Sequence, residues 1–152
     1  MLKRLIFTAV SISVLLVAAP SSFSNINLKD VTCEAYMFKN EDSRHPVFEF
    51  SPHDKVFIRV KFKNLKQGLY TLHTDWYNPL GKLQEKSSFQ FTQRRQASFS
   101  AQSWIQLKRA GFMKRVFSVS NSGGYNVKFF GEWRVVIYLN GEEMVTHRFK
   151  MI

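Results

Sequence analysis

Cysteine is nearly absent from this sequence: Cys33 is the single one among 152 residues. One cysteine excludes an internal disulfide, so the fold must be held together by its hydrophobic core alone. It also leaves too few thiolates for a closed zinc site, and no histidine pair has His-x-His or His-x-x-x-His spacing. The four histidines are His45, His53, His73 and His147. We therefore predict no metal site.

Glycine and proline are also scarce, with seven and four residues respectively. No glycine-rich phosphate loop is present, and no Gly-x-Ser-x-Gly nucleophile elbow occurs. The sequence thus carries no motif for nucleotide binding or for serine hydrolysis. We predict no cofactor and no catalytic residue.

Long apolar runs are limited to one, at the N-terminus. Lys3 and Arg4 precede the apolar stretch Leu5–Ala19, and small residues follow in Pro20–Ser24. This order is typical of a secretory signal peptide, and the run is short for a membrane span, which needs about 20 residues. We expect cleavage after Ser24 rather than after Ala19, with a retained N-terminal anchor as the alternative.

The expected division is therefore a signal peptide over residues 1–24 and one domain over residues 25–152, without a transmembrane segment in the mature chain. The protein would be periplasmic or secreted. Acidic residues are few, 11 against 22 Lys and Arg, and the formal net charge is +11. Removal of the leader would lower that charge to +9, since it takes away Lys3 and Arg4.

The mature chain shows the period-two alternation of β-strands. In residues 56–62, Val56, Ile58, Val60 and Phe62 alternate with Phe57, Arg59 and Lys61, which predicts an apolar row facing inward and a partly basic row facing outward. Runs of the same kind occur at 70–76, 89–91 and 99–107, and a weaker one occurs at 31–37. The clearest pair is 133–139 and 144–151. No stretch has convincing helical spacing.

Turn residues separate these runs. Asn140-Gly141, between two alternating runs, is a strong signal for a type I′ hairpin, and Asn78-Pro79-Leu80-Gly81 and Ser51-Pro52-His53-Asp54 predict two further turns. The polar segments Lys39–Arg44 and Thr92–Gln96 are expected to be loosely held. Together these features predict an all-β fold, a single antiparallel two-sheet sandwich of about seven strands.

Two segments carry a resemblance to a known kind of module. Asp75–Lys82 ends a strand in Trp76 and turns through Pro79 and Gly81, and Gly131–Gly141 is a Gly-x-Trp strand leading into the final hairpin. Together they resemble the immunoglobulin-like sandwich modules of bacterial envelope proteins. The resemblance implies an immunoglobulin-like fold and an envelope location, and it implies no particular function.

Two groups of residues allow a chemical as well as a structural interpretation. His73, Asp75 and Tyr77 would share one strand face, which could serve acid–base chemistry or form the solvated side of a sheet. Cys33 shares a face with Val31, Ala35 and Met37, so it is either a small buried side chain or a reactive thiol able to form an intermolecular bridge.

The basic surplus gathers in three doublets with aromatic residues between them. The candidate partner-binding residues are Arg94, Arg95, Trp104, Lys108, Arg109, Lys114 and Arg115. Such a region could contact an anionic lipid or glycan, or an envelope protein, whereas export argues against nucleic acid. The alternative is that the charge only keeps the protein soluble.

These features predict an exported, non-catalytic interaction or accessory module. An enzyme or inhibitor with a site on loops is the competing hypothesis. The two differ in whether folding gathers His73, Asp75 or another polar cluster into a concave pocket.

Overall fold

The chain forms a two-sheet β-sandwich, which confirms the predicted fold class. The computed structural model describes residues 26–107 and 127–152. In order, its elements are β1 (Thr32–Phe38), β2 (Glu49–Phe50), β3 (Lys55–Leu65), β4 (Gly68–Tyr77), β5 (Leu83–Gln93), β6 (Ala97–Gln106), the short 3-10 helix η1 (Val127–Phe129), β7 (Gly131–Leu139) and β8 (Glu142–Met151). The expected signal peptide lies outside the described residues.

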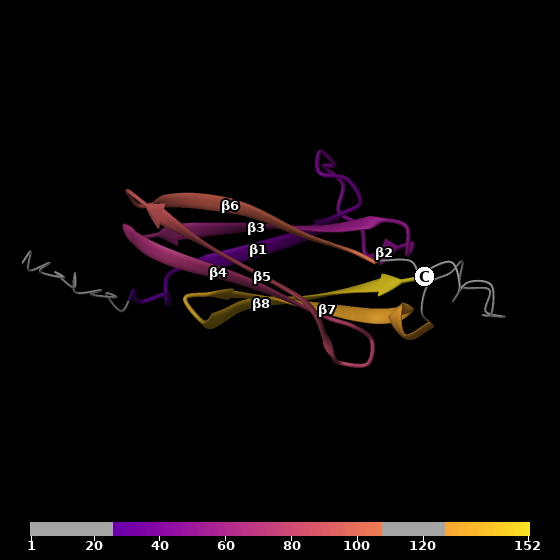
Figure 1. Cartoon of the computed structure of the whole chain (residues 1–152). Coiled ribbons are helices and arrows are strands. Elements are labelled where there is room, and N and C mark those ends of the chain that lie inside the picture. The colour runs from indigo at the N-terminus through magenta and orange to yellow at the C-terminus, as the bar shows by residue number, and fades with distance from the viewer. Residues whose placement is uncertain (1–25, 108–126) are drawn as a thin grey trace, which may run out of the picture.

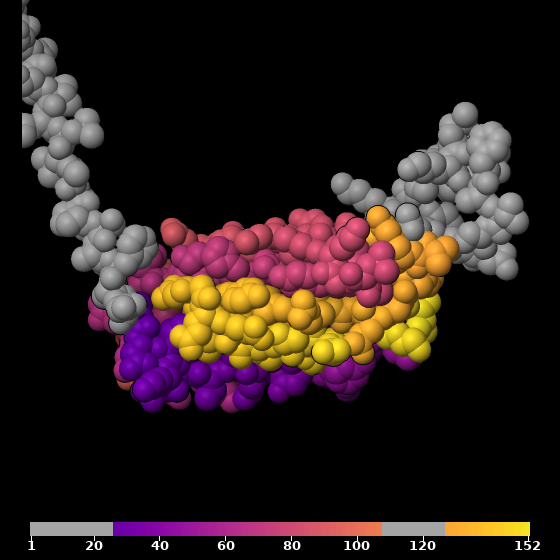
Figure 2. Space-filling view, turned by 90° about the horizontal axis from the view of Figure 1, so that it is seen from below, coloured from indigo at the N-terminus to yellow at the C-terminus, as the bar shows by residue number. Residues whose placement is uncertain are grey.

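The two sheets differ in width. One has three strands in the order β1-β3-β6, and the other has five in the order β2-β8-β7-β4-β5. They form the two layers seen in Figure 1, with β1, β3 and β6 in the upper layer and β7 and β8 in the lower one. Figure 2 views the molecule from the side of the five-stranded sheet, with β7 and β8 across its centre. Hydrogen bonding is antiparallel except for the two-residue β2, which runs parallel to β8.

The core lies between the sheets and follows the alternation in the sequence. In β3, Val56, Ile58, Val60 and Phe62 are at most 2% exposed and face the other sheet. Trp76 of β4 and Trp133 of β7 are fully buried on that sheet. Phe149 of β8 contacts both, with ring centroids 6.1 Å from Trp76 and 5.8 Å from Trp133. Aromatic packing of this extent supplies the core that a protein without a disulfide requires.

The predicted turns form as expected. Asn140 and Gly141 both have positive φ, 51° and 85°, as a type I′ turn requires. Asn78 closes the β4–β5 turn by accepting hydrogen bonds at its side-chain oxygen from the backbone N–H groups of Leu80 and Lys82. The Ser51–Asp54 turn closes through a 2.9 Å bond from the Asp54 N–H to the Ser51 carbonyl.

The two segments expected to be loosely held are tied to strands. Thr92 and Gln93 complete β5, and the chain then turns directly into β6. The segment Lys39–Arg44 folds back toward β3, because the Arg59 guanidinium donates a 2.6 Å hydrogen bond to the Glu41 carbonyl. Lys39 also pairs with Asp54 at 3.0 Å.

The described residues contain no helix that is long and apolar enough to cross a membrane.

Candidate functional site

Three of the predicted partner-binding residues, Arg94, Arg95 and Trp104, lie in the described part of the chain, and they do not form one patch. Arg94 and Arg95 lie at the hairpin between β5 and β6, and Trp104 lies near the far end of β6. The nine residues from Arg95 to Trp104 span roughly 30 Å of extended chain. Arg94 and Arg95 therefore do not share a patch with Trp104. Lys108, Arg109, Lys114 and Arg115 lie outside the described residues.

A different basic surface appears on the outer side of the three-stranded sheet. The outward positions of β3 are Lys55, Phe57, Arg59, Lys61 and Lys63, because they alternate with the buried row. We name this surface the basic–aromatic face, and it comprises these five residues with Tyr36 and Phe38 of β1 and Trp104 of β6.

Aromatic rings lie on both sides of the cationic row. Register places Phe57 between Phe38 of β1 and Trp104 of β6, and places Arg59 beside Tyr36. Tyr36 and Trp104 are 45% and 51% exposed, whereas Phe38 and Phe57 are nearly buried. Two flat rings therefore remain open to a partner beside the positive charges.

The cations are placed over these rings. Lys55 Nζ lies 4.3 Å from the centroid of the Trp104 ring and 5.9 Å from that of Phe57. The Arg59 guanidinium lies 4.7 Å from the Phe38 centroid. Such cation–π contacts hold the long side chains against the sheet while their charge stays near solvent.

The charge of the face is unbalanced. Its strands present four cations outward and one carboxylate, Glu34. Glu34 accepts a hydrogen bond from Lys63, and this bond holds the pKa of the Glu34 carboxyl below its usual value. With Glu34 paired to Lys63, the charges of Lys55, Arg59 and Lys61 remain available to an anionic group.

The His73, Asp75 and Tyr77 row lies on the outer side of the five-stranded sheet. Figure 2 views the molecule from this side. Asp75 is largely buried and faces Lys86 at 4.0 Å, and Arg134 lies 4.5 Å over the Tyr77 ring. The side chains of His73, Asp75 and Tyr77 do not line the three pockets identified among the described residues. The row is partly buried rather than solvated: Asp75 is buried, and His73 Nδ1 and Asp75 Oδ1 have no hydrogen-bond partner in the described part of the chain.

Metal ligands are not gathered within the described residues. No group of three or more His, Cys, Asp or Glu side chains there could hold an ion. The outer side of the five-stranded sheet carries both signs of charge in ion pairs, such as the 2.5 Å pair of Arg148 with Glu132 and the 4.0 Å pair of Lys86 with Asp75. That side thus differs from the basic–aromatic face, where cations dominate.

Cys33 is a free thiol that is half-buried on β1 and packs against the core. Burial, with a smaller contribution from the neighbouring Glu34 carboxylate, raises the pKa of the Cys33 thiol to about 11. Because the thiolate is the nucleophile, this environment suppresses reactivity at neutral pH. The structure thus favours the small-buried-side-chain interpretation over a reactive thiol.

The alternation in residues 56–62 predicts the outward row with Arg59 and Lys61, but the predicted partner-binding residues come from the region of adjacent basic doublets and include only Trp104 of the basic–aromatic face. The signal that could have found it is the alternation of Lys55, Arg59, Lys61 and Lys63 with buried residues. A period of two puts such residues on one side of a strand, whereas a doublet puts one residue on each side.

Comparison with known proteins adds little. No protein-family model matches the chain, and no curated protein matches it. Similar solved structures include a beta-glucosidase from Listeria innocua in complex with glucose, at 11% identity and a TM-score of 0.48, covering 80% of this chain. The complex of that enzyme with isofagomine has 13% identity and a TM-score of 0.49, again over 80% of this chain.

A beta-glucosidase involved in saponin metabolism from intestinal bacteria is also similar, at 9% identity and a TM-score of 0.47 over 81% of this chain. The chain spans 16% of the length of each of these enzymes. At such identities and TM-scores, the likeness carries no argument about function.

Proposed function

We propose that this protein is an exported, non-catalytic interaction module of the bacterial envelope that contacts an anionic partner through its basic–aromatic face. The observation that carries the proposal is the outward row of β3, in which Lys55, Arg59 and Lys61 lie among the exposed rings of Tyr36 and Trp104. Export rests on the basic, apolar and small-residue order of residues 1–24.

The arrangement suits a partner with repeated negative charge, such as an anionic lipid surface or an acidic glycan. The cations lie along one strand, where alternate residues are about 6.6 Å apart. The exposed rings can stack on or insert beside apolar parts of the partner. The competing enzyme hypothesis needs a polar cluster in a concave pocket. The His73 row does not line the pockets found among the described residues, and the cleft between the sheets has serines and one carboxylate, Glu85, but no histidine, lysine or cysteine in its described lining.

The test is co-sedimentation of the purified protein with lipid vesicles. Vesicles of phosphatidylglycerol and phosphatidylcholine are compared with vesicles of phosphatidylcholine alone, each at low and high salt. We expect binding to the anionic vesicles only, and weaker binding at high salt, because the Debye length is about 10 Å at 0.1 M salt and shrinks as salt rises. Equal binding to both vesicle types, or binding that salt leaves unchanged, would contradict the proposal.

A further inference from the structure

A cleft opens between the two sheets where β5 and β6 separate. The two strands share a hairpin and diverge from it, as Figure 1 shows. The five-stranded sheet extends past the narrower one, so residues 83–90 of β5 are exposed along their whole length. The inner side of β5 therefore overhangs the edge of the opposite sheet.

The side chains along β5 and β6 explain where the cleft begins. Near the hairpin, Phe91 and Phe99 stack with their ring centroids 3.7 Å apart, and Phe89 lies beside both. Farther from the hairpin, the inward positions of β5 are Ser87 and Glu85. These residues cannot fill the space that phenylalanines fill near the hairpin, and a cleft of about 500 Å³ remains.

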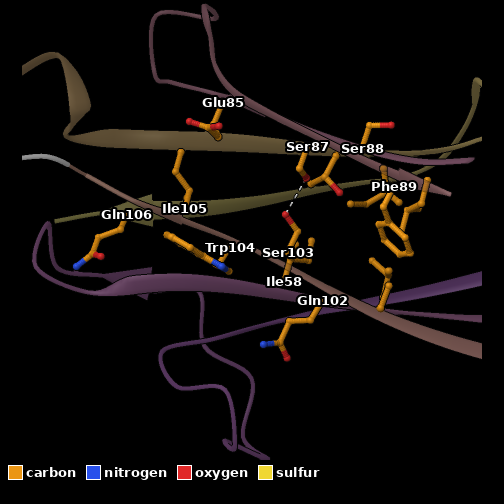
Figure 3. Close-up of a pocket in the computed structure, with 15 residues that line it drawn as sticks. Ile58, Glu85, Ser87, Ser88, Phe89, Gln102, Ser103, Trp104, Ile105 and Gln106 are labelled. Carbon is orange, nitrogen blue, oxygen red and sulfur yellow. Dashed lines mark hydrogen bonds between the residues drawn. The ribbon is translucent and has the colours of Figure 1, made fainter. Parts of the chain in front are cut away.

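The lining of the cleft combines an apolar floor with a polar rim. The floor consists of core residues such as Ile58, Leu72 and Ile137. Ser87 of β5 and Ser103 of β6 meet across the cleft through a 3.1 Å hydrogen bond, and Ile105 points toward Glu85 (Figure 3). Glu85 is the only charged residue among the described residues that line it.

Backbone groups flank the cleft as well. In the described part of the chain, β5 ends one sheet and β6 ends the other, so each has one edge without a neighbouring strand. Such an edge presents unpaired N–H and C=O groups that can accept a further strand. A strand added beside β6 would widen the narrow sheet and cover the overhanging side of β5.

We propose that this cleft binds an extended peptide segment, which pairs with the free edge of β6 and directs alternate apolar side chains toward β5. In the antiparallel orientation its first residues would lie next to Ile105, close to Glu85. The single carboxylate there selects a lysine or arginine at the first inward position. The site adjoins the basic–aromatic face, because Trp104 lies at its rim, but its own charged group is a carboxylate and it therefore prefers a ligand of the opposite charge.

A second copy of this chain fits the cleft poorly. Pairing of β6 with β6 of another copy would place each overhanging β5 under the neighbour's β6. The β5 strands of the two copies would then occupy the same space in the layer of the five-stranded sheets. A single strand from another polypeptide avoids this collision.

The test uses a fluorescent heptapeptide and the full-length protein as purified. The peptide has lysine at position one, valine at positions three, five and seven, and threonine between them. Fluorescence anisotropy measures its binding. We expect saturable binding that weakens about tenfold or more when alternate backbone nitrogens of the peptide are methylated, because methylation removes main-chain hydrogen bonds.

Protein variants locate the binding. Ser103→Leu fills the cleft and should weaken binding about tenfold or more. Ser100→Leu is its matched control, since it is the same change on the outer side of β6, and it should leave binding unchanged. Glu85→Gln, at an exposed position, should weaken binding about two- to fivefold, as expected for loss of a surface ion pair.

Several results would overturn the proposal. One is no binding of the heptapeptide, and another is equal binding to the Ser103→Leu and Ser100→Leu variants. If Ser103→Leu does not fold, the methylated peptide and Glu85→Gln still decide the question. A protein dimer that excludes the peptide would make a second copy the occupant and would also overturn it. Because the peptide assay does not measure vesicle binding and no variant in it changes a residue of the basic–aromatic face, its failure leaves the vesicle result untouched.

Discussion

At the scale of single residues, Trp133 shows how the core holds the fold without a disulfide. The side chain is fully buried, stacks on Phe149, and donates a 2.7 Å hydrogen bond from its indole N–H to the Phe129 carbonyl. That bond ties the backbone of η1, just before β7, to the core. The Trp133 side chain therefore contributes a large buried apolar surface, and its only polar group, the indole N–H, has a hydrogen-bond partner.

The change Trp133→Ala should lower the free energy of unfolding by about 3–5 kcal/mol, because it opens a large cavity in the core. Trp104→Ala is the matched control, since Trp104 is half exposed, and it should cost less than about 1 kcal/mol. Urea denaturation followed by circular dichroism measures both. Equal unfolding free energies for the two variants would show that Trp133 is no core anchor.

The Cys33 thiol should react slowly with iodoacetamide in the folded protein. Its pKa is raised from 9.0 to about 11, so the thiolate fraction at pH 8 falls about a hundredfold relative to an unperturbed thiol. The rate should rise about tenfold per pH unit up to pH 10. Protein unfolded in urea provides the comparison, and equal rates in the two states at pH 8 would contradict the assigned environment.

The raised pKa also links Cys33 to stability. The folded state holds the thiol proton more tightly than the unfolded state does. Its contribution to stability is therefore fully present below about pH 9 and is lost as the pH rises toward about 11.

At the scale of elements, the β7–β8 hairpin depends on backbone conformations that few residues adopt. Gly141 has a φ of 85°, and a Cβ placed there would meet no other atom within 4 Å. Any penalty for a side chain at this position is thus conformational rather than steric. Asn140 adds a tertiary contact, since its side-chain oxygen accepts a 2.8 Å hydrogen bond from the Thr71 N–H of β4.

Gly141→Val should lower the free energy of unfolding by at least about 1 kcal/mol, because a β-branched residue tolerates positive φ poorly. Gly141→Asn should cost less, since asparagine adopts the left-handed region more readily. Thermal denaturation of the two variants checks the order. A valine variant as stable as the asparagine variant would argue against the turn assignment.

The elements also show what the sequence could predict. Alternation in β3 and β4 and the Asn-Gly turn are local signals, so the strands, the inward row and the final hairpin could be inferred. The pairing of β3 with β6, which brings Trp104 beside Phe57, joins residues 47 positions apart and has no local signal. For that reason the sequence alone associates Trp104 with the nearby doublets and not with Lys55 and Arg59.

At the scale of the whole molecule, unequal sheet widths and uneven charge shape the surface. The three-stranded sheet carries cations and exposed rings on its outer side, and the five-stranded sheet carries both signs of charge. The cleft also follows from the unequal widths of the two sheets. The half of β5 that is distant from the β5–β6 hairpin has no strand of the three-stranded sheet opposite it. Neither feature is visible in composition or total charge.

The most direct test of the account compares two variants that lose the same charge. In one, Lys55, Arg59 and Lys61 of the basic–aromatic face are changed to Gln. In the other, Arg94, Arg95 and Lys150, which lie elsewhere on the surface, are changed to Gln. We predict that the first variant loses binding to phosphatidylglycerol vesicles at low salt while the second retains most of it, with both still folded by circular dichroism. Equal losses in the two variants would show that net charge, and not this face, governs the interaction.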